Sequence, residues 1–592
     1  MIDLFFDLES DGLLNDATLV HCLGHYHERY VKGPGISAGR ESIVEELDAM
    51  RLGDYRLIGH NVIGFDLPLL KKLYHFQVPQ ERVLDTLVLA RFIFPDTLPE
   101  DAKLVAKGKL PKGLMGSHSL EAWGHRLGVY KGDFKGPWKE SEVRAAALAE
   151  LHAMTPPKDD MDMILSVADE EYIEAAVAAW RKEMQEYCKQ DVVVTKKLFE
   201  HCMAQNPSWE AVELEHKVQG IIQRQIRHGI RFDTDRAIEL AAEMHDAHAR
   251  AEKVLVSRYR GWFAPVSPTP ERAVKIPARS NKTLGYVEGV PFTAVKYVEF
   301  NPGSRAHLIK VLKAEGWVPK KFTDAGNPKL DDEVLKGMTG ENIDAIRQYL
   351  LIEKRLGQIS EGKEAWLKHA RNGRIHGSVN TNGAVTGRMT HSSPNLAQVP
   401  SVPTDDEGHP VKGEAGGWGY ECRELFCVPQ GKRQVGCDAS GLELRMLAHY
   451  MGRYDGGVYG HEVVNGDIHT VNQHAAGLPT RKNAKTFILI IWDDLGATPR
   501  LKLCELREHP TGSSAGNPEP RACAITFLYE KITGPPSLPT LEKSHVASAR
   551  LPTRTYAYVK VQRPSLYGST AKRLEAHSPP KMEVKIWSGL AW

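Results

Sequence analysis

The sequence has few of the features that mark exported, membrane-spanning or zinc-binding proteins. Only eight of its 592 residues are cysteine, and no two of them form a CxxC pair. A zinc site and a disulfide scaffold are therefore not expected, and a reducing compartment suits the chain. Basic, cleavable leader patterns and runs of about 18 apolar residues are also missing, so we expect a cytoplasmic protein with no membrane partner.

An excess of charge of either sign is also missing. The 76 Lys and Arg residues nearly balance the 75 Asp and Glu residues, and the formal net charge is +1. This balance does not exclude a nucleic-acid partner, because basic grooves and acidic sites cancel in the sum. A single hydrophobic core rarely exceeds about 250–300 residues, so the length predicts several domains.

The periodicity predicts four segments. Residues 1–205 alternate short apolar strands with helical stretches, which is typical of an α/β domain. A long amphipathic helix that Gly229 ends opens the segment 206–374, which contains a proline-rich loop insertion at 262–300. Polar motifs on strands and helices are densest in 375–488. The tail 489–592 has 11 prolines and no clear helical or strand period.

Acidic side chains recur at three places in the first segment. Asp7 and Glu9 are two residues apart near the end of an apolar strand, so both should face the same side at a sheet edge. Asp66 precedes a helix, and Tyr187 and Asp191 share a helical face. A solvated strand, an N-cap and a surface pair would explain each feature alone, but they are poor explanations of all three together.

Four such carboxylates can hold two Mg²⁺ ions about 4 Å apart for in-line phosphodiester cleavage. The order Asp-x-Glu, HNxxxFD, YxxxD resembles the DEDD proofreading exonucleases of the tyrosine subtype, which have a ribonuclease H-like fold. The resemblance implies that Asp7, Glu9, Asp66 and Asp191 bind Mg²⁺, with Mn²⁺ as an alternative. It also implies that Tyr187 orients the attacking water and that the substrate is a single-stranded DNA 3′ end.

The segment Val379–Pro400 (VNTNGAVTGRMTHSSPNLAQVP) offers polar donors from a loop rich in small residues. Such donors suit minor-groove acceptors, which are alike for all correct base pairs, although a polar surface loop would look similar. The segment resembles the primer–template signature of family A DNA polymerases of small bacteriophages. The resemblance implies DNA contacts by Arg388, Gln398 and Asn395.

The next motif, QVGCDASGLELRMLAHYM, places Asp438 at a strand end and Glu443 on the following helix. Without its neighbours it could be a capped helix with a surface acid. After the preceding signature it resembles motif A of family A polymerases. Asp438 would then bind both catalytic Mg²⁺ ions, and Glu443 would screen the sugar 2′ position.

NGDIHT contains His469, and LPTRKNAKTFI places Arg481 and Lys485 on one helical face. A solvated basic face is the ordinary explanation of that pair. Here it resembles the start of the fingers helix, and implies that His469, Arg481 and Lys485 bind the incoming dNTP. The expected fold is a ribonuclease H-like domain followed by a right-hand polymerase with thumb, palm and partial fingers.

The resemblance implies DNA replication with proofreading in an infected bacterial host, on primer–template DNA. A phage helicase or single-strand binding protein is a candidate partner. Thioredoxin is not carried over, because the insertion at 262–300 is short for a thioredoxin-binding loop.

The resemblance ends in the fingers helix. Leu489 and Ile490 stand where the family has a tyrosine and a glycine, and no His-Asp-Glu motif with the second catalytic aspartate occurs. We therefore expect no primer extension by the chain as written, and a tail that derives from an intron or a shifted frame. Two alternatives stay open: a protein that acts only as a 3′–5′ exonuclease, and a non-catalytic DNA-binding remnant.

Overall fold

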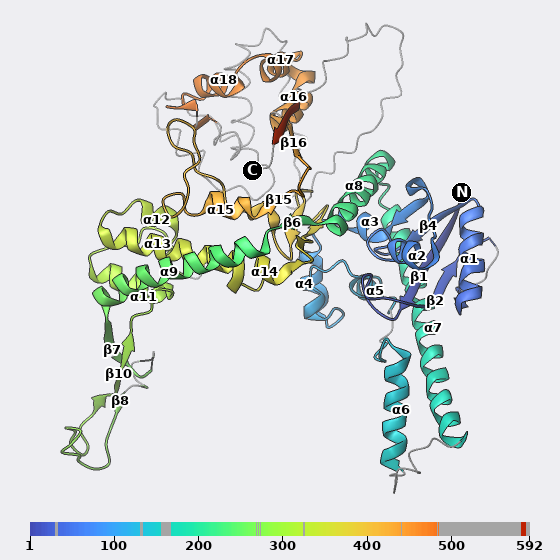
Figure 1. Ribbon diagram of the computed structural model, residues 1–592, viewed down its shortest axis with the longest axis horizontal. Coiled ribbons are helices and arrows are strands. Elements are labelled where there is room, and N and C mark those ends of the chain that lie inside the picture. The colour runs from blue at the N-terminus through green and yellow to red at the C-terminus, as the bar shows by residue number, and fades with distance from the viewer. Residues whose placement is uncertain are drawn as a thin grey trace, which may run out of the picture. The chain divides into compact units, whose positions relative to one another are not determined.

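The computed structural model describes residues 1–29, 33–130, 134–154, 167–267, 269, 272, 274–323, 326–439, 441–481, 483–484 and 582–587 (Figure 1). One compact unit comprises Met1–Gly431, and a second lies within Lys432–Gly589. Among the described residues, no helix combines the length and the apolar character needed to cross a bilayer.

The first part of the larger unit is an α/β domain, as its alternating pattern predicts. Its strands are β1 (Ile2–Ser10), β2 (Val20–Tyr26), β3 (Gly35–Ala38), β4 (Tyr55–Gly59) and β5 (Val83–Asp85). Its helices are α1 (Arg40–Leu52), α2 (Asp66–Tyr74), η1 (Gln80–Arg82), α3 (Thr86–Ile93), α4 (Leu98–Ala106), η2 (Lys112–Leu114), α5 (Leu120–Leu127), α6 (Glu140–Met154) and α7 (Val167–Met203).

These strands form one mixed sheet in the order β3-β2-β1-β4-β5. The strand β1 is antiparallel to β2 and parallel to β4, so it is the central strand. The pairing with β4 covers only Ile2–Phe5, so Asp7 and Glu9 lie beyond it at the carboxyl-end edge of the sheet, in agreement with their expected place at a strand end. They lie near the carboxyl end of a strand that has a neighbour on each side.

Alternation along β1 separates two cores. Leu4, Phe6 and Leu8 pack with buried residues of α1 and α2, whereas Phe5 packs with buried residues of α3 and α7. Because successive side chains of a strand point to opposite faces, Asp7 and Glu9 share the face of Phe5. That face is covered by α7, which contacts both β1 and β2.

The middle of the chain is mostly helical. Its elements are α8 (Trp209–His228), β6 (Ile230–Phe232), α9 (Thr234–Tyr259), β7 (Gly261–Pro265), β8 (Val274–Lys275), β9 (Phe292–Thr293), β10 (Val295–Glu299), α11 (Arg305–Ala314), α12 (Asp332–Lys336), α13 (Glu341–Leu356), the π-helical turn η3 (Gly357–Glu361) and α14 (Trp366–His369). The amphipathic helix predicted from residue 211 is α8, which Ser208 caps and Gly229, at φ +66°, ends.

The insertion at 262–300 is more regular than its proline content suggested. The strands β7 and β10 pair antiparallel from Gly261 to Pro265, and β8 pairs with β9. The expectation of a loop is therefore corrected to two short β-ribbons, which project from the helices in Figure 1. The paired strands satisfy each other's backbone hydrogen bonds, and such pairing is not visible in the hydrophobic periodicity of the sequence.

The rest of the larger unit consists of short elements. They are β11 (Ala370–Arg371), β12 (Arg374–Ile375), β13 (Ser378–Asn380), β14 (Thr390–Ser392), η4 (Leu396–Gln398), α15 (Gly419–Glu424) and β15 (Phe426–Cys427). The strands β11, β12, β6 and β15 form one sheet, and β13 pairs with β14 as a separate hairpin.

The smaller unit contains β16 (Gln434–Ala439), α16 (Leu442–Asp455), α17 (Val458–Asn465), α18 (Ile468–Ala475) and β17 (Met582–Trp587). The strand β17 pairs antiparallel with β16. Leu444 and Ala448 of α16 pack against Tyr459 of α17 and Ile468 of α18.

Candidate exonuclease and polymerase sites

Asp7, Glu9 and Asp66 meet near the end of β1. Asp66 is the first residue of α2 and only 4% exposed. Phe65 is the N-cap of that helix and makes no side-chain cap bond, so an N-cap role does not explain Asp66. Burial and the nearby Asp7 carboxylate raise the pKa of Asp66 well above its ordinary value, and the Leu8 N–H bonds to its carboxylate.

The helix α7 brings the other two predicted residues to the same strand. Cys188, which follows Tyr187, donates a hydrogen bond from Sγ to the main-chain oxygen of Asp7 at 3.5 Å. Gly24 permits this approach, because a Cβ there would lie 3.0 Å from Cys188 Sγ. Asp191 is 3% exposed one turn further along α7. The helix therefore places the Tyr187 and Asp191 turn over the acidic end of β1.

Cys188 has a place in this centre that the sequence did not indicate. Its Sγ and one oxygen each of Asp7 and Glu9 lie within 4.8 Å of one another, which is compatible with a metal ion. However, a contact with Cys22, burial, and the charges of Asp7 and Glu9 raise the pKa of the Cys188 thiol well above its ordinary value. The thiol already donates to the Asp7 main-chain oxygen, and Mg²⁺ prefers oxygen to sulfur ligands, so we assign Cys188 to packing and keep the carboxylates as the metal ligands.

Asp85 fixes the loop that leads to Asp66. Its carboxylate accepts hydrogen bonds from the backbone N–H groups of Asn61 at 2.8 Å, Ile63 at 3.1 Å and Leu87 at 2.9 Å. Asp85 is also the N-cap of α3. An aspartate directly before an apolar helix is the sequence signal for this cap.

The predicted primer–template segment is a β-hairpin followed by a short 3₁₀ turn rather than an irregular loop. Val379 of β13 pairs with His391 of β14. Position 383 must be glycine, because a Cβ there would clash with Thr390 Oγ1. Arg388 is exposed in the connection between the strands. The side chain of Asn395 caps η4 by accepting the Ala397 N–H, whereas the side chain of Gln398 is exposed.

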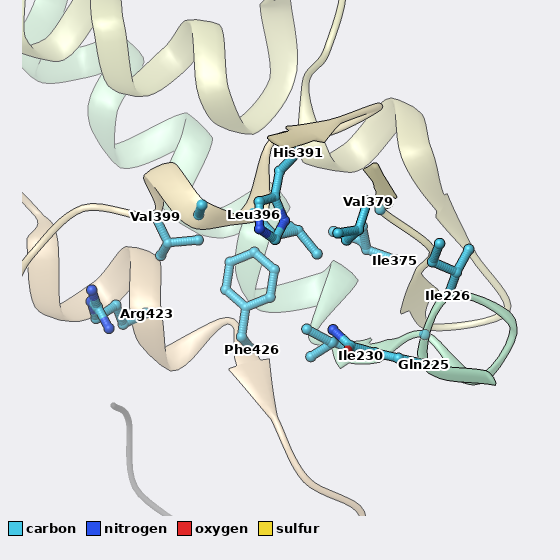
Figure 2. A pocket seen from close by; sticks show the side chains of 13 residues that line it. Gln225, Ile226, Ile230, Ile375, Val379, His391, Leu396, Val399, Arg423 and Phe426 are labelled. Atoms are coloured by element: carbon cyan, nitrogen blue, oxygen red, sulfur yellow. The ribbon is translucent and has the colours of Figure 1, made fainter. Parts of the chain in front are cut away.

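An apolar pocket of about 240 Å³ lies beneath this hairpin. Figure 2 shows Phe426 of β15 facing Leu396 and His391 across it, with Ile230 and Gln225 at one side. Arg423 borders the pocket, and its Nε donates to the Pro400 oxygen at 2.5 Å. The hairpin therefore rests on apolar side chains while its polar turn stays exposed.

In the smaller unit, Asp438 is the fifth residue of β16, and Glu443 lies in the first turn of α16. Both placements agree with the predicted strand end and helix. His469 is in the first turn of α18, which Asp467 caps. Lys485 lies outside the described residues.

Arg481 is already bonded to a carboxylate. Its Nε donates to Asp467 Oδ2 at 2.8 Å and a terminal nitrogen donates to Oδ1 at 3.0 Å. The guanidinium holds the pKa of Asp467 below its ordinary value, with help from the Thr470 hydroxyl. This two-point geometry is the one that a guanidinium also offers to phosphate oxygens.

Comparison with known proteins agrees with these features. The model of DNA polymerase family A matches residues 275–486, which include Arg388, Asp438 and Arg481. The DNA-directed DNA polymerase of Enterobacteria phage T3 is 38% identical over 562 residues, covering 82% of this chain and 74% of the relative. That of Escherichia phage T7 is 37% identical over 559 residues, covering 81% and 74%.

The chain therefore belongs to the family A DNA polymerases, which are metal-dependent nucleotidyltransferases. Within that family it is similar to the polymerases of the two phages. A solved structure, the POL domain of Pol1 from M. smegmatis in complex with DNA primer-template and dNTP, has a TM-score of 0.47 and 17% identity to this chain, and covers 89% of it and 73% of that chain.

Proposed function

We propose that residues 1–205 are a proofreading exonuclease that removes nucleotides from single-stranded DNA 3′ ends, joined to a polymerase body that binds primer–template DNA and dNTPs. The observation that carries the exonuclease proposal is the buried Asp66 beside Asp7, at the end of a strand that also carries Glu9. Two carboxylates held together under a protein layer are costly unless cations neutralise them.

The residues fit divalent cations. Asp7 and Glu9 present oxygens within 4.8 Å of each other, and Asp66 has a raised pKa that a cation would reverse. With Asp191 they form a set of hard oxygen ligands, which suits Mg²⁺, with Mn²⁺ as an alternative. When bound, two such ions would stabilise the charge on the attacking and leaving oxygens of the phosphodiester.

The protein would orient the reactants. Tyr187 is half-buried on α7, with its ring 5.9 Å from that of Phe134, so its hydroxyl has a restricted set of positions. We assign this hydroxyl to holding the attacking water. Asp191 lies one turn further on the same helix, so the rigidity of α7 fixes the spacing of the two groups.

The polymerase body would hold duplex DNA with the hairpin of β13 and β14. Arg388 and Gln398 are exposed and can donate to minor-groove acceptors. Asn395 contributes mainly through its cap of η4, which orients Gln398. Asp438 would bind the polymerase metals, and Glu443, His469, Arg481 and Lys485 would bind the dNTP.

Degradation of a 3′-labelled single strand with Mg²⁺ tests the exonuclease. The double variant Asp7→Ala/Glu9→Ala should lose at least about a thousandfold in rate, because several kcal/mol of charge stabilisation disappear. The matched control, Asp438→Ala, removes an aspartate near the end of another strand and should leave degradation unchanged. Equal rates for wild type and the double variant would refute the exonuclease.

Primer extension in the same buffer separates the remaining hypotheses. Degradation without extension is the outcome we predict, since the sequence contains no His-Asp-Glu motif. If the wild type binds DNA but neither degrades nor extends it, the chain is a non-catalytic DNA-binding protein.

We further propose the segment boundaries 1–205, 206–374, 375–488 and 489–592, and action in the cytoplasm of an infected bacterium. The end of the family match at residue 486 supports the last boundary. The origin of residues 489–592 in an intron or a shifted frame stays a prediction. The nucleotide sequence beyond the codon for Ile488 tests it, and the absence of a downstream exon that encodes the rest of the fingers would contradict it.

A further inference from the structure

One helix, α8, bonds to residues beside both proposed sites. The helix α8 contacts α3 and η1 on the exonuclease side and β13 on the polymerase side. It also carries two buried polar side chains, His216 and Gln219, three positions apart. Polar side chains as buried as this are retained only where they have specific partners.

His216 faces the exonuclease. Its Nε2 accepts the Asp85 backbone N–H at 2.8 Å, and its Nδ1 lies 2.7 Å from the Val212 oxygen of its own helix. The first bond requires Nε2 without a proton, so Nδ1–H is the donor to Val212. The imidazole is thereby held in one tautomer and one orientation, with 5% of its surface exposed.

From His216 the bonds continue to the carboxylate site. Asp85 receives the N–H groups of Asn61 and Ile63, and the chain from Asn61 runs directly into Asp66. The side chain of Gln80, in the turn before β5, donates to the His216 oxygen at 2.5 Å. The loop before Asp66 is therefore held through Asp85 by a helix that lies outside residues 1–205.

Gln219 faces the hairpin. Its Oε1 accepts the Thr381 hydroxyl at 3.1 Å, and both side chains are less than 5% exposed. One turn earlier, Glu215 accepts the Asn382 amide at 2.5 Å. Thr381 and Asn382 directly follow β13 and begin the connection that carries Arg388. These bonds fix where the hairpin turn leaves the body of the unit.

We propose that α8 is a shared positioning helix, in which His216 holds the Asp66 loop for metal binding and Gln219 holds the Arg388 hairpin for duplex binding. The proposal rests on the proposed function of the two sites. Neither residue reaches a substrate or a metal, so each acts through the group it orients. Groups that orient metal ligands typically change metal affinity about 10- to 100-fold when they are removed.

The test compares two substitutions on this helix. His216→Leu and Gln219→Leu each replace a buried hydrogen-bonding side chain by an apolar one, three residues apart. Mn²⁺ binding is followed by electron paramagnetic resonance in the full chain with Asp438→Asn, so that only the exonuclease carboxylates are titrated. Duplex binding is followed by fluorescence anisotropy of a labelled primer–template without nucleotide.

His216→Leu should weaken Mn²⁺ binding about 10-fold and leave duplex affinity within about twofold. Gln219→Leu should do the reverse, and weaken duplex binding about threefold to 10-fold at constant salt. His216→Gln, which can present an acceptor to the Asp85 N–H, should restore Mn²⁺ affinity to within about threefold. A purely structural role would lower both readouts together in both variants, and would not be rescued selectively.

Unchanged Mn²⁺ affinity in His216→Leu, or the same pattern in the two leucine variants, would overturn the proposal. A wild type that binds Mn²⁺ through Asp7 and Asp66 but degrades no DNA would refute the exonuclease instead, while the comparison of the two helix variants would still be decisive. The two failures are therefore distinguishable.

Discussion

The carboxylate centre at the end of β1 and the hairpin of β13 and β14 lie in the same unit, but they are built in opposite ways. Asp66 and Asp191 are at most 4% exposed, and burial raises the pKa of Asp66. Arg388 and Gln398 are exposed above an apolar pocket. The centre gathers its acidic side chains under a protein layer, whereas the hairpin segment presents its polar side chains at the surface. Assembly of the centre costs stability, and exposure of the hairpin costs very little.

The substitution Asp66→Asn should give the largest effect that tests this contrast. The amide removes a metal ligand, so we expect a loss of exonuclease activity of about a thousandfold or more. A group whose folded-state pKa is raised contributes stability at acid pH that is lost as the pH rises through that pKa. Asp66→Asn should therefore stabilise the metal-free protein at pH 7, on the order of 1–3 kcal/mol.

Chemical denaturation with EDTA, at pH 7 and at pH 4, measures this effect. The stabilisation should be smaller at pH 4, where the wild-type carboxyl carries its proton. A destabilised variant at pH 7 would mean that the centre is not strained by its own charge, and would remove the contrast with the hairpin.

The exposed side of the comparison is tested by Arg388→Ala. Loss of one charged contact to DNA should weaken primer–template binding about 10-fold, and the free energy of unfolding should change by less than about 1 kcal/mol because the side chain is exposed. Arg371→Ala, which removes another exposed arginine of the same unit, is the matched control. If the two variants bind duplex equally well, the hairpin is not the contact surface.

A smaller effect is expected from His118, a half-buried base beside Arg126 and Arg91. Burial, together with Arg126 and Arg91, lowers the pKa of His118 to about 4. Between its ordinary value of 6.5 and about 4, the unfolded chain binds the proton more readily, so stability falls as the pH is lowered through this range. This is the opposite trend to that of Asp66.

His118→Gln should therefore flatten the acid limb of the stability curve, by about 2 kcal/mol between pH 7 and pH 5. Urea titrations at the two pH values measure the difference. An acid limb that is unchanged in His118→Gln would assign the effect to other groups.

The smallest effect is expected at the Asp467–Arg481 pair in the second unit. Both side chains are about half exposed, so the pair should contribute little to stability. In Asp467→Asn the guanidinium loses a competing carboxylate, and dNTP binding should tighten about twofold to fivefold. The melting temperature of the protein should change by less than about 1 °C. Weaker nucleotide binding would show that Asp467 orients Arg481 instead of competing for it.

Much of the architecture was accessible from the sequence. The strands around Asp7 and Asp438, the helix α8 and the helix that carries Tyr187 and Asp191 were predicted from period and caps, because these signals are local. The β-ribbons of the insertion and the hairpin around Arg388 were not, since pairing depends on a partner strand that a single segment does not specify.

The order and spacing of the motifs predicted the family and the candidate site residues, because the same side-chain types recur wherever the same chemistry is performed. Only the tertiary structure decided which of them meet. It brought Cys188 beside Asp7, gave Asp85 three backbone N–H groups, and linked Asp85 to His216 across 131 positions. Contacts of that separation depend on how helices and strands pack, and packing is a property of the whole fold that no local pattern encodes.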